Sequence, residues 1–82
     1  MMIQSNEEML EKIRLDRPNQ VINEVKSFHM NKSGFYNVLV DMESMFFDTK
    51  ILHSTVTLPY PSIEYDNLSQ KEQLAFRWGE II

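Results

Sequence analysis

The sequence predicts a compact, mainly helical domain of three or four helices with one extended segment or small β-hairpin before the last helix. Three observations support this prediction: two serine–glutamate pairs at helix N-cap spacing, apolar residues that recur at helical spacing, and one β-branched segment. The alternative is an α+β fold in which residues 35–42 and 51–58 pair as antiparallel strands. Residues 1–82 are expected to form a single small domain, because either half would be too small for its own core.

The N-terminal third of the chain is predicted to form two helices. Ser5 and Glu8 have the spacing of a capping box, in which each side chain accepts a hydrogen bond from the other residue's backbone N–H. This spacing predicts a helix over residues 6–15. Pro18 suits a first helical turn and predicts a second helix over residues 18–29. The apolar residues that recur at helical spacing in the second helix are Val21, Ile22, Val25 and Phe28.

The C-terminal part is predicted to hold an extended segment and a last helix. Residues 51–58 are rich in β-branched side chains and are followed by a proline, so they are expected to be extended. Ser69 and Glu72 repeat the capping-box spacing and predict a helix over residues 70–81. Trp78 is expected to pack inward from this helix.

Residues 33–48 carry two competing patterns. One is an apolar alternation typical of a strand, formed by Tyr36, Val38, Val40 and Met42. The other is a polar stripe at helical spacing, formed by Asn37, Asp41, Ser44 and Asp48. The polar stripe covers more residues and favours a helix. The two patterns are distinguished by which set shares one face of the folded chain.

The composition predicts a cytoplasmic protein with no membrane partner. The chain contains no cysteine, whereas small domains in oxidising compartments often depend on disulfides. The first residues lead directly to Glu7 and Glu8, without the basic region and apolar stretch of a secretory signal. The apolar runs are also far shorter than the roughly 20 residues that span a bilayer.

The sequence lacks the motifs of common catalytic and cofactor sites. Its glycines are Gly34 and Gly79, too few for a phosphate-binding loop. Its histidines, His29 and His53, lie in different predicted elements and show no metal-ligand spacing. No nucleophile-elbow pattern is present. We therefore predict a non-enzymatic protein without catalytic residues, metal or cofactor.

Residues 28–39 contain one motif that indicates DNA binding. An apolar residue, a turn residue and a second apolar residue precede Asn31, a small polar cap. This pattern resembles the turn and recognition helix of helix-turn-helix domains, especially those of insertion-sequence transposases and tetracycline-repressor-type regulators. The resemblance implies a dimeric DNA-binding regulator, with DNA contacts from Asn31, Lys32, Ser33 and Asn37. The excess negative charge of the chain lies wholly within residues 33–82 and would meet DNA phosphates unfavourably.

Residues 41–66 combine acidic and aromatic side chains, a combination typical of a protein-binding surface. Aromatic rings supply binding energy at protein interfaces, while charges steer the encounter with an oppositely charged surface. The residues predicted to bind a partner are Asp41, Glu43, Phe46, Phe47, Asp48, Tyr60, Glu64 and Tyr65. The extended segment 51–58 is also suited to pair with the sheet edge of a partner.

The first hypothesis is therefore a small regulatory or inhibitory protein that acts by binding a larger protein. A nucleic-acid enzyme is one candidate partner, because its basic groove would suit an acidic surface. The size, charge and composition of the chain resemble those of small accessory proteins of bacteriophages and mobile elements, including counter-defence inhibitors.

Overall fold

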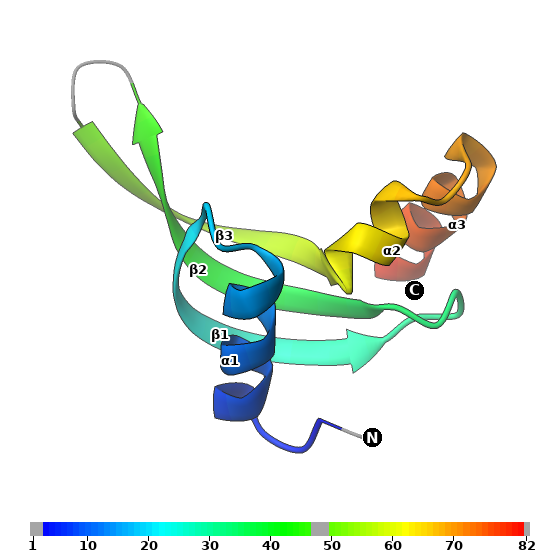
Figure 1. The fold of residues 1–82 in the computed structure, drawn as a ribbon, viewed down its shortest axis with the longest axis horizontal. Coiled ribbons are helices and arrows are strands. Elements are labelled where there is room, and N and C mark those ends of the chain that lie inside the picture. Colours follow the sequence, from blue (N-terminus) through cyan, green and yellow to red (C-terminus); the bar gives the residue numbers. More distant parts are fainter. Residues whose placement is uncertain (1–2, 47–49, 82) are drawn as a thin grey trace.

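The chain folds as an α+β structure, described by a computed structural model over residues 3–46 and 50–81. The elements in chain order are α1 (Asn6–Asp16), β1 (Val21–Met30), β2 (Tyr36–Phe46), β3 (Lys50–Tyr60), α2 (Ser62–Asp66) and α3 (Gln70–Ile81). The three strands form one antiparallel sheet in chain order, with β2 in the centre. Figure 1 shows α1 against one face of the sheet and α2 and α3 beside the end of β3. Within the described residues, no helix is long and apolar enough to cross a membrane.

The prediction of a mainly helical domain is wrong, because residues 21–30 and 36–46 form strands where helices were expected. The α+β alternative is closer to the structure, since residues 35–42 and 51–58 contribute to the paired strands β2 and β3. The apolar alternation decides the conformation of β2. Val38 and Val40 are fully buried on one face, as a strand requires.

The strand β1 has a burial pattern that imitates a helix. Its pairing with β2 is irregular between Ile22 and Glu24 and again between Val25 and Ser27. Each irregularity is a bulge that adds one residue to β1, so inward-facing side chains recur every three residues instead of every two. This spacing is close to the helical period of about 3.6 residues, which explains the incorrect prediction.

The predicted capping box is complete at Ser69 and Glu72 and half-formed at Ser5 and Glu8, where the Glu8 carboxylate accepts from the backbone N–H of Gln4 at 3.2 Å instead of that of Ser5. The backbone N–H of Glu8 donates to Ser5 Oγ at 3.1 Å and begins α1. The backbone N–H of Glu72 donates to Ser69 Oγ at 3.3 Å, and the Ser69 N–H donates to Glu72 Oε1 at 3.2 Å. The two terminal helices therefore begin where the sequence predicts. The side chain of Trp78 lies outside the described residues.

The main core lies between α1 and one face of the sheet. Its buried residues are Met9, Ile13, Ile22, Val25, Val38 and Val40. The helix α1 lies along β1, so the β1 and β2 side chains beneath it are buried. Val56, Leu58 and Tyr60 of β3 pack against the same core but remain half-buried. The β3 side of the core is therefore the less covered side.

A second, aromatic cluster joins the C-terminal helices to the turn between β1 and β2. The Phe35 ring lies edge-on to the Tyr65 ring at 6.2 Å and to the Phe76 ring at 6.0 Å, measured between ring centroids. The Tyr65 and Phe76 rings are 4.9 Å apart. Phe35 and Phe76 are buried, so this contact anchors α3 to the sheet.

Candidate protein interface

The face of the sheet opposite α1, here called the open face, is lined mainly by polar side chains. Strand pairing places these residues in cross-strand rows, each with one residue from β1, β2 and β3. The rows are His29, Asn37 and Pro59; Ser27, Leu39 and Thr57; Glu24, Asp41 and Thr55; and Val21, Glu43 and His53. Asn37 is the buried member of this set, and the others are exposed or half-exposed. The open face is therefore accessible over most of its rows.

Three carboxylates on the open face form an acidic patch, made of Glu24, Asp41 and Glu43. Glu24 is the direct cross-strand partner of Asp41, and Glu43 follows Asp41 by two residues on the same side of β2. Like charges placed opposite each other on a sheet destabilise it. The patch therefore costs folding stability in the isolated chain and creates a region of negative potential.

Nearby basic groups only partly balance the acidic patch. Lys26 Nζ lies 3.6 Å from Glu24 Oε1, and His53 Nε2 lies 3.7 Å from Glu43 Oε1, a contact that is ionic only when the imidazole is protonated. Both pairs are substantially exposed, and exposed ion pairs contribute little energy. Asp41 makes no ion pair with any residue that the structure describes. The negative charge of the patch thus remains available to an incoming partner.

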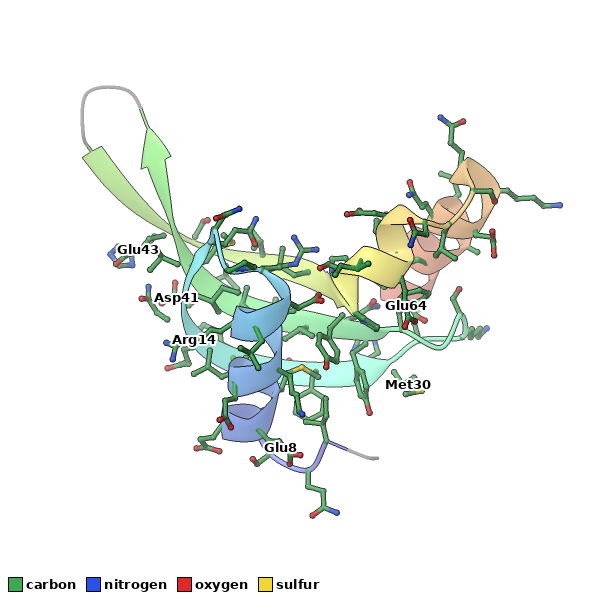
Figure 2. The ribbon with its side chains drawn as sticks, viewed as in Figure 1. Glu8, Arg14, Met30, Asp41, Glu43 and Glu64 are labelled. Atoms are coloured by element: carbon green, nitrogen blue, oxygen red, sulfur yellow. The ribbon has the colours of Figure 1, made fainter. Side chains whose placement is uncertain are left out.

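The structure brings together two of the predicted partner-binding residues, Asp41 and Glu43. Figure 2 shows both on the left of the view and Glu64 well apart from them on the right, on α2. Tyr65 packs inside the aromatic cluster and is unsuited to anchor a partner. The Phe46 side chain, Phe47 and Asp48 lie outside the described part of the chain. Glu24 was not predicted, because its place beside Asp41 follows only from the β1–β2 pairing.

Tyr60, also predicted to bind a partner, lies on the side of the sheet that faces α1. Its ring centroid is 6.2 Å from that of Tyr36. Burial raises the pKa of the Tyr60 hydroxyl above its ordinary value, and the nearby Asp16, Tyr36 and Glu64 raise this pKa further. Tyr60 is therefore a packing residue of the core, on the other side of the sheet from the acidic patch.

The residues predicted to contact DNA lie in and beside the β1–β2 turn, where no recognition helix forms. The predicted helix-turn-helix is therefore wrong, because bulged β1, the turn and β2 occupy its place. Asn31 Oδ1 accepts hydrogen bonds from the backbone N–H groups of Ser33, at 2.9 Å, and Phe35, at 3.1 Å. Gly34 completes the turn with a φ of 87°, a conformation that favours glycine. Asn31 thus stabilises the turn.

Asn37 also supports the hairpin instead of facing a groove. Its side chain is 2% exposed. Asn31 Nδ2 donates to its Oδ1 at 3.2 Å, and its Nδ2 lies 3.3 Å from His29 Nε2. The remaining predicted DNA contacts, Lys32 and Ser33, are exposed at the turn. Two of the four predicted DNA contacts therefore have hydrogen-bonding roles within the protein.

Comparison with known proteins finds no match to a family model, a curated protein or a solved structure. A hollow of about 150 Å³ lies on the open face between its first two rows. Its lining residues are Ser27, His29, Asn37, Leu39 and Thr57. Among the described residues, no three metal-ligating side chains converge, in this hollow or elsewhere.

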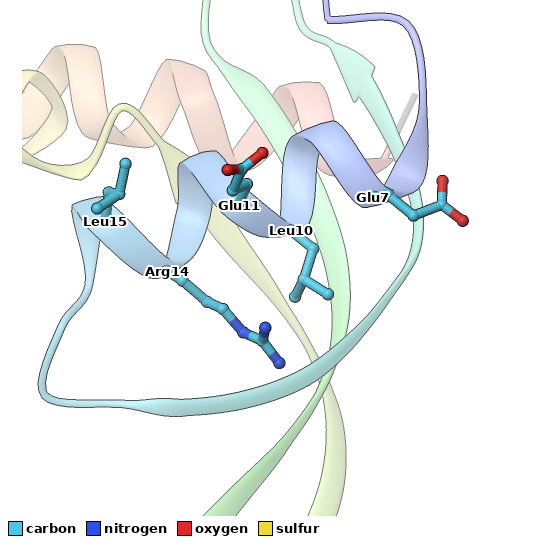
Figure 3. Close-up of a pocket in the computed structure, with 5 residues that line it drawn as sticks. All are labelled: Glu7, Leu10, Glu11, Arg14 and Leu15. Carbon is cyan, nitrogen blue, oxygen red and sulfur yellow. The ribbon is translucent and has the colours of Figure 1, made fainter.

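A second depression lies beside α1 (Figure 3). This groove has a volume of about 380 Å³ and is lined by Glu7, Leu10, Glu11, Arg14 and Leu15. The Arg14 guanidinium donates to the backbone oxygen of Ile22 through Nε, at 3.0 Å, and Nη2, at 2.8 Å. Arg14 therefore fastens α1 to β1. All the residues that line the groove belong to α1, so the groove lacks the polar groups that converge from several elements in a ligand site.

Proposed function

We propose that this protein is a small, non-enzymatic regulatory or inhibitory protein that binds a basic surface of a larger protein through its open face. The observation that supports the proposal is the placement of Glu24 directly opposite Asp41 on an accessible sheet face. This arrangement opposes folding in the isolated chain. Positive charges on a partner would neutralise these carboxylates, so binding would relieve the repulsion between them.

The surroundings of the acidic patch suit a protein interface. Thr55 and Thr57 of β3 are exposed and offer hydroxyl groups for hydrogen bonds beside the carboxylates. Leu39 supplies an apolar contact in the neighbouring row. Clustered negative charge accelerates encounter with a basic groove, and this acceleration weakens as salt is added. The groove of a nucleic-acid enzyme has the required charge, as in a counter-defence inhibitor, and the cysteine-free chain suits the cytoplasm.

The test begins with affinity capture by the tagged protein from a lysate of the cells that carry its gene, with and without nuclease, read by mass spectrometry. The decisive step compares Asp41→Lys with Glu64→Lys. Both substitutions change the net charge equally, but Glu64 lies on α2, away from the patch (Figure 2). We expect Asp41→Lys to lose the captured protein and Glu64→Lys to retain it.

A stability measurement gives a second, independent readout. Asp41→Lys replaces a like-charge pair with an opposite-charge pair across from Glu24, so we expect the free energy of unfolding to rise by about 0.5 kcal/mol. Loss of binding together with a gain in stability would separate function from folding. Equal loss of capture in the two variants, or capture that vanishes after nuclease treatment, would contradict the proposal.

A further inference from the structure

The two outer edges of the sheet are protected very differently. On β1, the Arg14 guanidinium bonds to the backbone oxygen of Ile22, and Asn6 Nδ2 donates to the backbone oxygen of Lys26 at 3.3 Å. The same strand carries two bulges. Bulges and covering side chains are both known to block the addition of another strand to a sheet edge. The β1 edge is therefore closed to strand pairing.

The β3 edge shows none of these protections among the residues that the structure describes. Its 11 residues pair with β2 without a bulge. Beyond its ladder with β2, the backbone of β3 makes no hydrogen bond with any other described residue. Within β3, residues 51–58 contain no proline, glycine, lysine or acidic residue; the residue types that discourage strand addition, Lys50 and Pro59, stand only at its two ends. A long, regular and unprotected edge of this kind is a template for another strand.

The apolar face at this edge is incompletely covered as well. Val56 and Leu58 belong to the rim of the core but stay half-buried. The helix α1 packs on the same face of the sheet but over β1, at the opposite edge. A strand added beside β3 would extend the sheet and bring further apolar side chains next to these two. Among the residues that the structure describes, β3 thus has no strand beside it on the outer side, and its Val56 and Leu58 side chains stay half-buried.

We propose that β3 pairs antiparallel with β3 of a second copy of this chain, about a two-fold axis, to form one continuous sheet from the two three-stranded sheets. The charge distribution favours a second copy. Lys50 is the first residue of β3, and His53, which is basic only when protonated, is its fourth. The acidic residues Glu64 and Asp66 lie just past its other end, on α2. Antiparallel self-pairing places the basic start of one β3 beside the acidic α2 of its partner.

This geometry also brings like surfaces together. A two-fold axis perpendicular to the sheet keeps equivalent faces on the same side. With Thr55 opposite Thr55 of the second copy, the half-buried Val56 lies diagonally across from its equivalent on the same face, and the two open faces lie side by side. The dimer does not depend on the proposed binding of a larger protein, and each proposal survives failure of the other.

The test measures the mass of the full chain by sedimentation equilibrium over a range of concentrations. We expect the mass to rise from 9.8 kDa to twice that value. Thr55 is exposed in the middle of β3, so Thr55→Glu and Thr55→Lys each place like charges on both sides of the new strand pair. We expect each variant alone to be monomeric and their equimolar mixture to form a dimer.

The matched controls are Asn19→Glu and Asn19→Lys, at an exposed position in the connection between α1 and β1. Both controls should dimerise like the parent chain. Circular dichroism verifies that all variants fold. Three outcomes would overturn the proposal: a parent chain that is monomeric throughout, a dimer unaffected by the Thr55 substitutions, or a mixture of the two Thr55 variants that stays monomeric. In the first case, capture of an unrelated strand by β3 becomes the remaining explanation for its open edge.

Discussion

The carboxylate of Asp16, the last residue of α1, accepts a hydrogen bond from the backbone N–H of Ser62, the first residue of α2. The Ser62 hydroxyl also donates to the backbone oxygen of Asp16 at 3.3 Å. The two residues are 46 positions apart in the chain. Their contact connects the N-terminal helix to the C-terminal helices across the end of the sheet.

Asp16→Ala is expected to lower the free energy of unfolding by about 1–3 kcal/mol, because the partly buried N–H of Ser62 would lose its acceptor. Asp16→Asn retains a side-chain oxygen and should cost less. Urea denaturation followed by circular dichroism measures both values. If Ala and Asn substitutions cost the same, the carboxylate acts through its charge and not as the acceptor for Ser62.

Asn31→Ala is expected to destabilise the β1–β2 turn by about 1–3 kcal/mol, because two backbone N–H groups would lose their shared acceptor. Asn31→Asp keeps this acceptor but loses the Nδ2 donor to Asn37 Oδ1, so the difference between the two variants separates the acceptor from that second contact. Chemical denaturation compares the two variants with the parent chain. A neutral effect of Asn31→Ala would show that the turn forms without this side chain.

Phe76→Ala is expected to cost about 3 kcal/mol, since the ring is 2% exposed and packs against Phe35 and Tyr65. Phe76→Leu fills part of the same space and should cost less than half as much. The near-ultraviolet circular dichroism of Tyr65 should weaken in the alanine variant. An unchanged spectrum and unchanged stability would mean that α3 is not anchored by this cluster.

Alkaline pH is expected to destabilise the fold through Tyr60. Burial raises the pKa of its hydroxyl in the folded state, whereas the unfolded chain titrates near the ordinary value of about 10. Above about pH 10 the unfolded state therefore binds fewer protons than the folded state, and stability falls as pH rises. Tyr60→Phe should make this fall less steep in unfolding experiments between about pH 9 and pH 11. Equal slopes would exclude Tyr60 as the source.

The sequence predicts the terminal helices well because their starts depend on local contacts. The Ser5–Glu8 and Ser69–Glu72 pairs each lie within one helical turn, so their hydrogen bonds do not require the rest of the fold. The conformation of residues 18–29 depends on pairing with β2, which the sequence does not display. Bulges in that pairing give β1 its three-residue burial spacing and make the helical interpretation attractive.

The candidate interface was predicted only in part, for a related reason. Asp41 and Glu43 were recognised as acidic residues of one segment, but on a helix they would point in different directions. On a strand they share a face, and the antiparallel register adds Glu24 from β1. The aromatic residues Tyr60 and Tyr65 were predicted to be exposed anchors, yet packing against Tyr36 and Phe35 uses their surface inside the fold.

The meander topology has a consequence for the folding kinetics. Each strand pairs with its neighbour in the chain, so both hairpins form from contacts of short sequence separation. The Asp16–Ser62 contact spans 46 positions and closes a much larger loop. We expect this closure to follow the rate-limiting step, so that Asp16→Ala accelerates unfolding while leaving the folding rate nearly unchanged. The contact between α1 and α2 would then control the unfolding rate, and with it the lifetime of the native state.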